Sequence, residues 1–126
     1  MPPMPPREKD FAARARSVRE TLAFARRNPQ AVIGLAPEGG DQPGGVVTWP
    51  ASGAGRFVLL LAEVGFPILP VGIYEEAGEF CLGFGAPYHL QVSLGLNPDE
   101  KDRAVSQIVM SAIAAQLPPR LRGVFG

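Results

Sequence analysis

The segment at residues 37–45 constrains the fold of this chain most strongly. Its sequence, PEGGDQPGG, is dominated by glycine and proline, so it must be a loop. It separates a short apolar run at residues 31–36 from a second apolar run at residues 57–62, the longest in the chain. A bilayer-spanning helix needs about 20 apolar residues, so any membrane contact of this chain is expected to be peripheral.

Three segments have the pattern of helices. Residues 7–27 place apolar side chains on one face, and Asn28 and Pro29 end the pattern. Residues 56–64 are apolar almost all round, as in a buried helix, with Gly65 as the residue that ends it. The third helix is expected to begin at Asn97 as N-cap, with Pro98 in the first helical position and Glu100 completing a capping box. The apolar face of the first helix consists of Phe11, Ala15, Val18, Leu22 and Ala25.

Four segments have the pattern of strands. The apolar run at residues 31–36 is bounded by turn signals, and residues 68–74 and 79–83 flank a predicted hairpin turn at 75–78. Residues 88–94 form the fourth predicted strand. The order of helices and strands predicts an α/β fold with a mixed sheet flanked by helices. We expect residues 33–36 and 68–74 to share one sheet, with the helix at 57–64 packed on it.

Charge is balanced over the chain but unevenly distributed. The net charge is zero, which gives no support for nucleic-acid binding. Residues 1–27 carry seven basic residues against three acidic ones, whereas residues 28–102 carry two against nine. The basic face of the first helix is either solvated or in contact with anionic lipid head groups. Cys81 is the single cysteine, which excludes an internal disulfide and fits a reducing compartment.

Two short blocks carry chemistry together. Residues 33–39 read IGLAPEG, and after 27 intervening residues comes PILPV at 67–71. Glu38 follows a predicted strand at the end where open α/β sheets bind ligands. The residues alone leave two roles for Glu38 equally open, ligand binding and the capping of a turn. Trp49 either lines a groove or packs in the core, and packing is favoured.

The two blocks, in this order and with an apolar helix between them, resemble the third and fourth conserved blocks of the phospholipid/glycerol acyltransferase family, which includes lysophosphatidate acyltransferases. The resemblance covers about residues 8–95 and implies the C-terminal half of that fold. The family transfers an acyl group from coenzyme A or acyl carrier protein to a glycerolipid-type hydroxyl, without a metal or other cofactor. The resemblance implies acceptor binding by Glu38, Gly39 and Gly40, and a site floor shaped by Pro67, Ile68 and Pro70.

The chain departs from the family pattern at two places. Family members often continue the Glu-Gly pair with Thr and Arg, where this chain has Gly40 and Asp41, and Asp41 would repel a phosphate. Arg56 is a candidate substitute, although a solvated arginine at a helix end is the more common situation. The family reaction also needs a His four residues before an Asp, with the His as general base. The single histidine, His89, lies after the PILPV block with no Asp at the required position, so we interpret it as structural.

These departures leave two hypotheses. In the first, the chain is an acyltransferase-family protein that is truncated or inactive, with residues 1–6 as a linker or disordered segment and residues 7–126 as one incomplete domain. Such a chain is expected in the cytoplasm, with peripheral contact at the inner face of the membrane through helix 7–27. An apolar surface is then expected where the missing N-terminal half would pack, or where the chain self-associates. In the second hypothesis, the chain is a non-catalytic interaction module.

Overall fold

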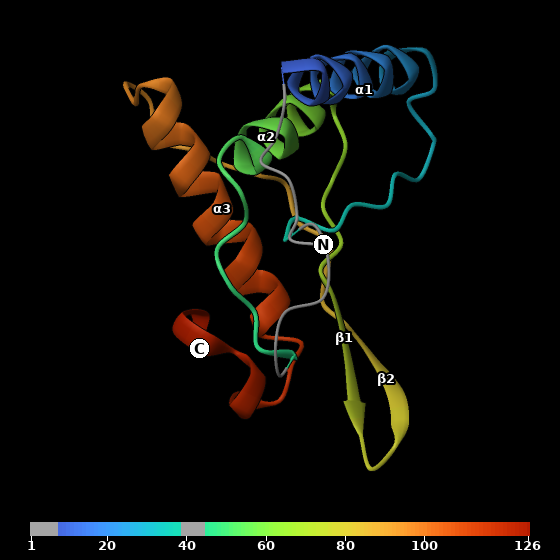
Figure 1. The fold of residues 1–126 in the computed structure, drawn as a ribbon, viewed down its shortest axis with the longest axis vertical. Helices are drawn as coiled ribbons and strands as arrows, with labels where there is room; N and C mark the ends of the chain where they lie inside the picture. Colours follow the sequence, from blue (N-terminus) through green and yellow to red (C-terminus); the bar gives the residue numbers. More distant parts are fainter. Residues whose placement is uncertain (1–7, 39–44) are drawn as a thin grey trace. The chain divides into compact units, whose positions relative to one another are not determined.

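The computed structural model describes the backbone of residues 8–38 and 45–126, and the side chains of residues 15–38 and 45–126. The chain forms two compact units, Met1–Val32 and Ile33–Gly126. The first contains helix α1 (Glu8–Arg27). The second contains helices α2 (Ala54–Val64) and α3 (Pro98–Ala114), the hairpin of strands β1 (Val71–Glu76) and β2 (Glu79–Phe84), and the short 3₁₀ turns η2 (Pro119–Leu121) and η3 (Gly123–Phe125) (Figure 1). The described part is therefore a small α/β protein, as the sequence predicts.

All three predicted helices are confirmed, together with the residues that delimit them. Asn28 ends α1 by donating from both its backbone and its side-chain nitrogen to the carbonyl of Phe24, each at 2.9 Å. Gly65 ends α2 with a left-handed backbone, at φ 119°. At the start of α3, the Asn97 side chain accepts from the backbone N–H of Glu100 at 2.8 Å, and the Glu100 carboxylate accepts from the backbone N–H of Asn97. The predicted capping box is therefore present.

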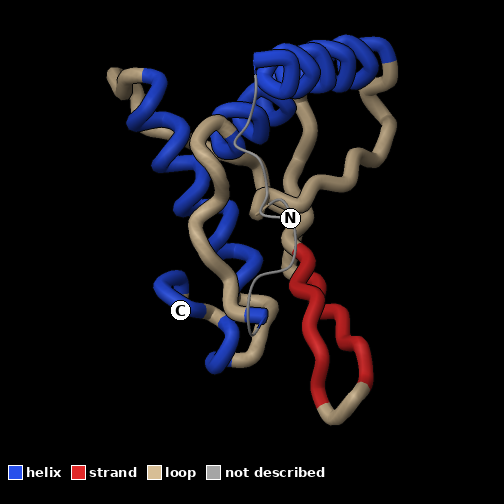
Figure 2. Tube along the Cα trace, in the orientation of Figure 1, coloured by secondary structure: helices blue, strands red, loops and turns tan. Residues whose placement is uncertain are grey.

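The predicted hairpin is also confirmed, but its turn is shorter than the predicted 75–78, because Glu75 and Glu76 pair within the strands. β1 and β2 pair antiparallel through a two-residue turn in which Ala77 and Gly78 both have positive φ, at 52° and 80°. That geometry matches the right-handed twist of the flanking strands. The hairpin extends beyond the helices of its own unit (Figure 2).

The predicted mixed sheet is not observed in the described residues, where β1 and β2 form a two-stranded antiparallel sheet. Residues 31–36 lie outside any strand or helix, and Val32 and Leu35 are exposed. The prediction that residues 33–36 and 68–74 share a sheet is therefore wrong. An apolar run becomes a strand only when a neighbour pairs its backbone groups, and no pairing of this segment is observed in the part of the chain that the structure describes.

The strands predicted at residues 68–74 and 88–94 are shorter than expected, for a related reason. Ile68 and Tyr88 form an isolated antiparallel bridge, with N–H to O=C distances of 2.7 and 2.9 Å. The strand predicted at 68–74 begins only at Val71, and the strand predicted at 88–94 is reduced to the bridge at Tyr88. Proline interrupts both sides of this ladder because it has no N–H to donate. The prolines concerned are Pro67, Pro70 and Pro87.

The core of the second unit surrounds α3. One cluster joins α3 to the C-terminal turns and to the segment that follows the glycine-rich loop, and Val47 donates to the carbonyl of Leu121 at 3.0 Å. A second cluster lies between α2 and α3, so α2 packs mainly on α3 and not on a sheet as predicted. The buried members of the first cluster are Val47, Met110, Ala114, Leu117, Leu121 and Phe125, and those of the second are Val58, Val105 and Val109.

Gly55 sets the approach of α2 to α3. A Cβ atom at this position would collide with the backbone carbonyl oxygen of Asp102 and would lie 2.7 Å from the Ser106 hydroxyl oxygen. Ser106 is buried. Because the closest atom belongs to the backbone of α3, the collision could be relieved only by moving the helices apart.

We therefore predict that Gly55→Ala lowers the free energy of unfolding by about 1–3 kcal/mol, the usual cost of overpacking. Helix propensity alone would change stability in the opposite direction, by about 1 kcal/mol, so the sign of the effect is diagnostic. Urea unfolding followed by circular dichroism measures it. The matched control is Gly34→Ala, where a Cβ meets nothing within 4 Å. Gly55→Ala at or above wild-type stability would contradict the close helix crossing.

Candidate functional site

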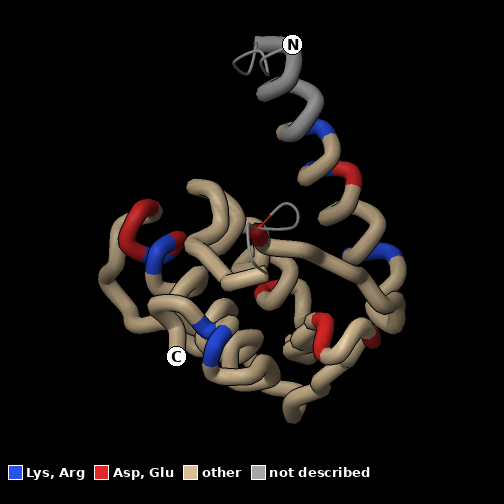
Figure 3. Tube along the Cα trace, turned by 60° about the horizontal axis from the view of Figure 1, so that its bottom comes forward, with Lys and Arg blue, Asp and Glu red and all other residues tan. Residues whose placement is uncertain are grey.

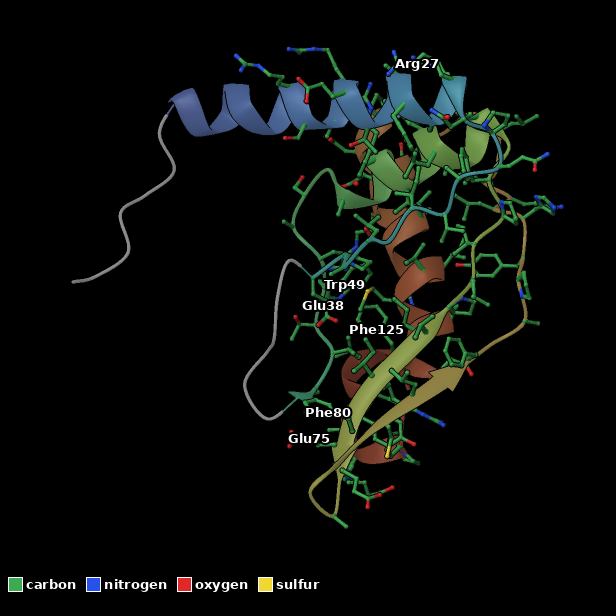
Figure 4. All side chains as sticks on the ribbon, turned by 90° about the vertical axis from the view of Figure 1, so that its right-hand side faces the viewer. Arg27, Glu38, Trp49, Glu75, Phe80 and Phe125 are labelled. Carbon is green, nitrogen blue, oxygen red and sulfur yellow. The ribbon has the colours of Figure 1, made fainter. Side chains whose placement is uncertain are left out.

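Glu38 lies at the base of the glycine-rich loop and holds the two sides of that loop together. Its carboxylate oxygen Oε2 accepts a hydrogen bond from the backbone N–H of Thr48 at 3.0 Å. The side chain is half-buried, and Figure 4 shows it near Trp49. Glu38 therefore closes the loop, in place of the turn cap left open by the sequence, and this contact orients the carboxylate. A carboxylate accepts several hydrogen bonds, so this contact leaves capacity for a ligand hydroxyl.

Gly39 and Gly40, predicted to bind the acceptor beside Glu38, lie outside the described residues, as does Asp41. On the far side of the loop the chain is firmly placed. Val47 is buried in the core, and Trp49 packs edge-on against Phe125 with ring centroids 4.9 Å apart. The guanidinium of Arg103 lies 3.9 Å from the centre of the Trp49 ring, within the range of a cation–π contact. Trp49 is thus a packing residue, as favoured from the sequence.

Arg56 is placed by its backbone. Its N–H donates to Oδ1 of Asp102 at 2.8 Å, and the N–H of Gly53 donates to Oδ2 of the same carboxylate at 3.0 Å. Gly53, the N-cap of α2, has no side chain to cap the helix, so Asp102 of α3 does so from outside. The positive end of α2 is therefore already neutralised by a carboxylate, which disfavours a phosphate there. The Arg56 side chain is exposed. The backbone of Arg56 bonds to Asp102, whereas the Glu38 carboxylate bonds to Thr48.

The predicted floor residues follow one another toward the hairpin. Pro67 is exposed, Ile68 packs against the cluster between α2 and α3, and Pro70 is buried. The carbonyl of Pro70 accepts from the N–H of Gly85 at 2.9 Å, which continues the hairpin beyond its strands. These residues form a rigid connection between α2 and the hairpin.

The remaining polar candidates do not gather into a catalytic or metal-binding group in the described residues. His89 is exposed and lies outside any strand, so the predicted place of this residue on a strand is not observed. Its neighbour Tyr88 has a buried hydroxyl without a hydrogen-bond partner in the described residues, and burial raises the pKa of this hydroxyl above its ordinary value. In the part of the chain that the structure describes, no three His, Cys, Asp or Glu side chains gather as metal ligands. No described helix is long and apolar enough to cross a membrane.

The basic helix retains an exposed charged surface. Four described arginines of α1, Arg16, Arg19, Arg26 and Arg27, are exposed. Figure 3 colours the basic and acidic positions along the described chain. Leu22 and Ala25, on the predicted apolar face, are buried, and Val18 is half-buried, but Ala15 on the same face is exposed. The predicted division of this helix into an apolar and a basic side is therefore present from Val18 onward.

Sequence reasoning missed Asp102 and Thr48. Thr48 acts through its backbone N–H, which leaves no signature in the sequence. Asp102 lies inside α3, four positions before Ser106, and nothing in its own helix marks it as a cap for another. The signal that did exist was the pair Gly53 and Gly55 at the start of α2, because two glycines at a helix start indicate a close neighbour.

The chain was compared with known proteins at three levels. No family model, curated protein or solved structure matches it. The account of its function therefore depends on its own residues.

We predict that Asp102→Ala lowers the free energy of unfolding by about 1–2 kcal/mol, because the first turn of α2 loses its acceptor and its favourable charge. Asp102→Asn retains one oxygen acceptor and should lose less. Chemical denaturation of the two variants measures the difference. Equal and negligible effects of both variants would show that α2 does not depend on this cap.

Proposed function

We propose that this chain is a member of the phospholipid/glycerol acyltransferase family that provides the acceptor-binding side of the site and does not itself catalyse acyl transfer. The observation that carries the proposal is the fixed carboxylate of Glu38 at the base of the glycine-rich loop. In the proposed role, Glu38 accepts hydrogen bonds from the hydroxyls of a glycerolipid-type acceptor.

Two carboxylates define the proposed acceptor further. In the sequence, Asp41 stands where the family often has an arginine, which disfavours an acceptor phosphate there. Asp102 occupies the N-terminus of α2 and disfavours a phosphate at that helix end. We therefore propose an acceptor that presents free hydroxyls to Glu38. Acyl-CoA or acyl carrier protein would be the donor, as the family resemblance implies.

The sequence lacks the His–Asp pair that catalyses the family reaction. The chain contains one histidine, and His89 has no Asp at the spacing that the family reaction needs. A general base typically contributes about 10²- to 10⁴-fold to the rate of a reaction of this kind. In the proposed role, the His–Asp block would be supplied by another polypeptide segment. The protein would act in the cytoplasm, with the arginines of α1 available to anionic lipid head groups.

A second candidate function, a non-catalytic interaction module, is favoured by a different observation. The hairpin presents large apolar side chains to solvent, as described in the next subsection. In this alternative the exposed hairpin is the functional surface, and Glu38 only closes the loop.

We predict that the purified 126-residue chain shows no acyl transfer above background with acyl-CoA and a lysophospholipid, because its sequence has no His and Asp at the family spacing to supply the general base. A radiolabelled-acyl assay measures the reaction, with a complete family enzyme as positive control. Clear turnover would contradict the proposal, and His89→Ala would then show whether His89 supplies the base.

A further inference from the structure

In the β1–β2 hairpin the apolar face is turned to solvent, the reverse of the usual arrangement. One face carries Ile73, Phe80, Leu82 and Phe84, hereafter the hairpin face. Their exposed fractions are 65%, 79%, 58% and 62%. The register pairs Ile73 with Leu82 and Val71 with Phe84, so these side chains lie together on one side. The face turned to solvent is therefore the apolar one, whereas an ordinary half-buried hairpin turns its polar side outward.

The opposite face is fixed against the end of α3 by glycines. A Cβ at Gly72 would lie 2.7 Å from the carbonyl oxygen of Gln116, and a Cβ at Gly83 would lie 2.6 Å from the same atom. Side chains are excluded at Gly72 and Gly83, which are themselves paired across the strands, while Tyr74 on the same face packs against the core around α3. Because successive residues point to opposite faces, this contact forces the large apolar residues outward. Their exposure follows from the register and not from a single side-chain rotamer.

The exposed area is large for a two-stranded unit. A buried aromatic side chain accounts for roughly 150–250 Å², so the hairpin face presents on the order of 500 Å² of apolar surface. The largest apolar patch on a typical monomer is about 300–600 Å² and is often functional. A two-stranded hairpin is also only marginally stable unless its faces are packed.

The charges at the rim indicate what can cover this face. Glu75 lies opposite Phe80 at the tip, where Figure 4 shows the two residues close together, and Glu76 and Glu79 complete an acidic tip. Glu76 is bridged by Arg120 at 3.5 Å. An anionic lipid surface would be repelled by the acidic tip. A second protein layer can instead pack on the apolar centre, since stacked sheets lie about 10 Å apart with their side chains interdigitated.

We propose that a second copy of this chain covers the hairpin face, with the two hairpins stacked face to face about a two-fold axis perpendicular to the strands. Two such faces together bury on the order of 1,000 Å², about the least that a biological interface needs and in the range of weak association. In a two-fold contact the same apolar residues of the two copies meet. With the strands antiparallel across the axis, the acidic tips lie at opposite ends of the interface, and the zero net charge of the chain adds no long-range repulsion. This proposal is independent of the role of Glu38.

Sedimentation equilibrium of the full chain, from a few micromolar to several hundred micromolar, tests the proposal. We expect the mass to rise from that of a monomer to that of a dimer, because an interface of this size supports modest affinity. The informative variant is Phe80→Lys. In the monomer the lysine would lie opposite Glu75 as a favourable cross-strand pair, so the hairpin should still form. In the dimer it would bury a charge, and we expect the dissociation constant to rise at least about a hundredfold.

The matched control is Leu94→Lys, which makes the same change in charge at a residue that is 98% exposed and lies outside the hairpin. It should leave the dissociation constant within about threefold of the wild-type value, the usual range for a surface substitution. Circular dichroism confirms that both variants are folded. A chain that stays monomeric at several hundred micromolar would overturn the proposal. So would a dimer that Phe80→Lys leaves intact, because the copies would then associate through another surface.

Discussion

The close crossing of α2 and α3 at Gly55 is the contact on which the rest of the larger unit depends. It allows the Asp102 carboxylate to reach the first turn of α2, where it accepts from the N–H groups of Gly53 and Arg56. It also brings Val58 of α2 against Val105 and Val109 of α3 in a shared cluster. A single side chain at Gly55 would separate the helices and weaken the cap and the cluster together. The start of α2 is consequently unfavourable for an anionic ligand.

The same device, glycine against a backbone carbonyl, orients the hairpin. Gly72 and Gly83 allow both strands to pass over Gln116 at the end of α3, and the alternation of the strands then turns the apolar residues to solvent. Close packing on one face and apolar exposure on the other are thus two consequences of one register. An unpaired apolar face on a small domain indicates a partner layer, whether the chain acts as part of an enzyme or as an interaction module.

The sequence predicted those elements whose signals are local. The capping box at Asn97, the left-handed end of α2 at Gly65 and the turn at Ala77 and Gly78 are each decided by a few neighbouring residues. The strand at residues 31–36 was wrong because an apolar run does not reveal whether a partner strand will pair with it. For the site, the sequence predicted Glu38 at the carboxyl end of a strand, and that strand is not observed, so Glu38 instead lies at the start of the glycine-rich loop. Its backbone partner Thr48, and the cap that Asp102 provides from another helix, depend on tertiary contacts that single-sequence patterns do not encode.

The central claim is that Glu38 binds the hydroxyls of a glycerolipid-type acceptor and that the chain does not catalyse acyl transfer. The most direct test is the binding of a soluble acceptor to the isolated chain. A short-chain monoacylglycerol, titrated below its critical micelle concentration into the ¹⁵N-labelled protein, would be followed by the amide shifts. The account predicts saturable shifts centred on Glu38 and Thr48, which Glu38→Ala abolishes while the fold is retained. Shifts that are absent at millimolar acceptor, or that persist unchanged in Glu38→Ala, would contradict it.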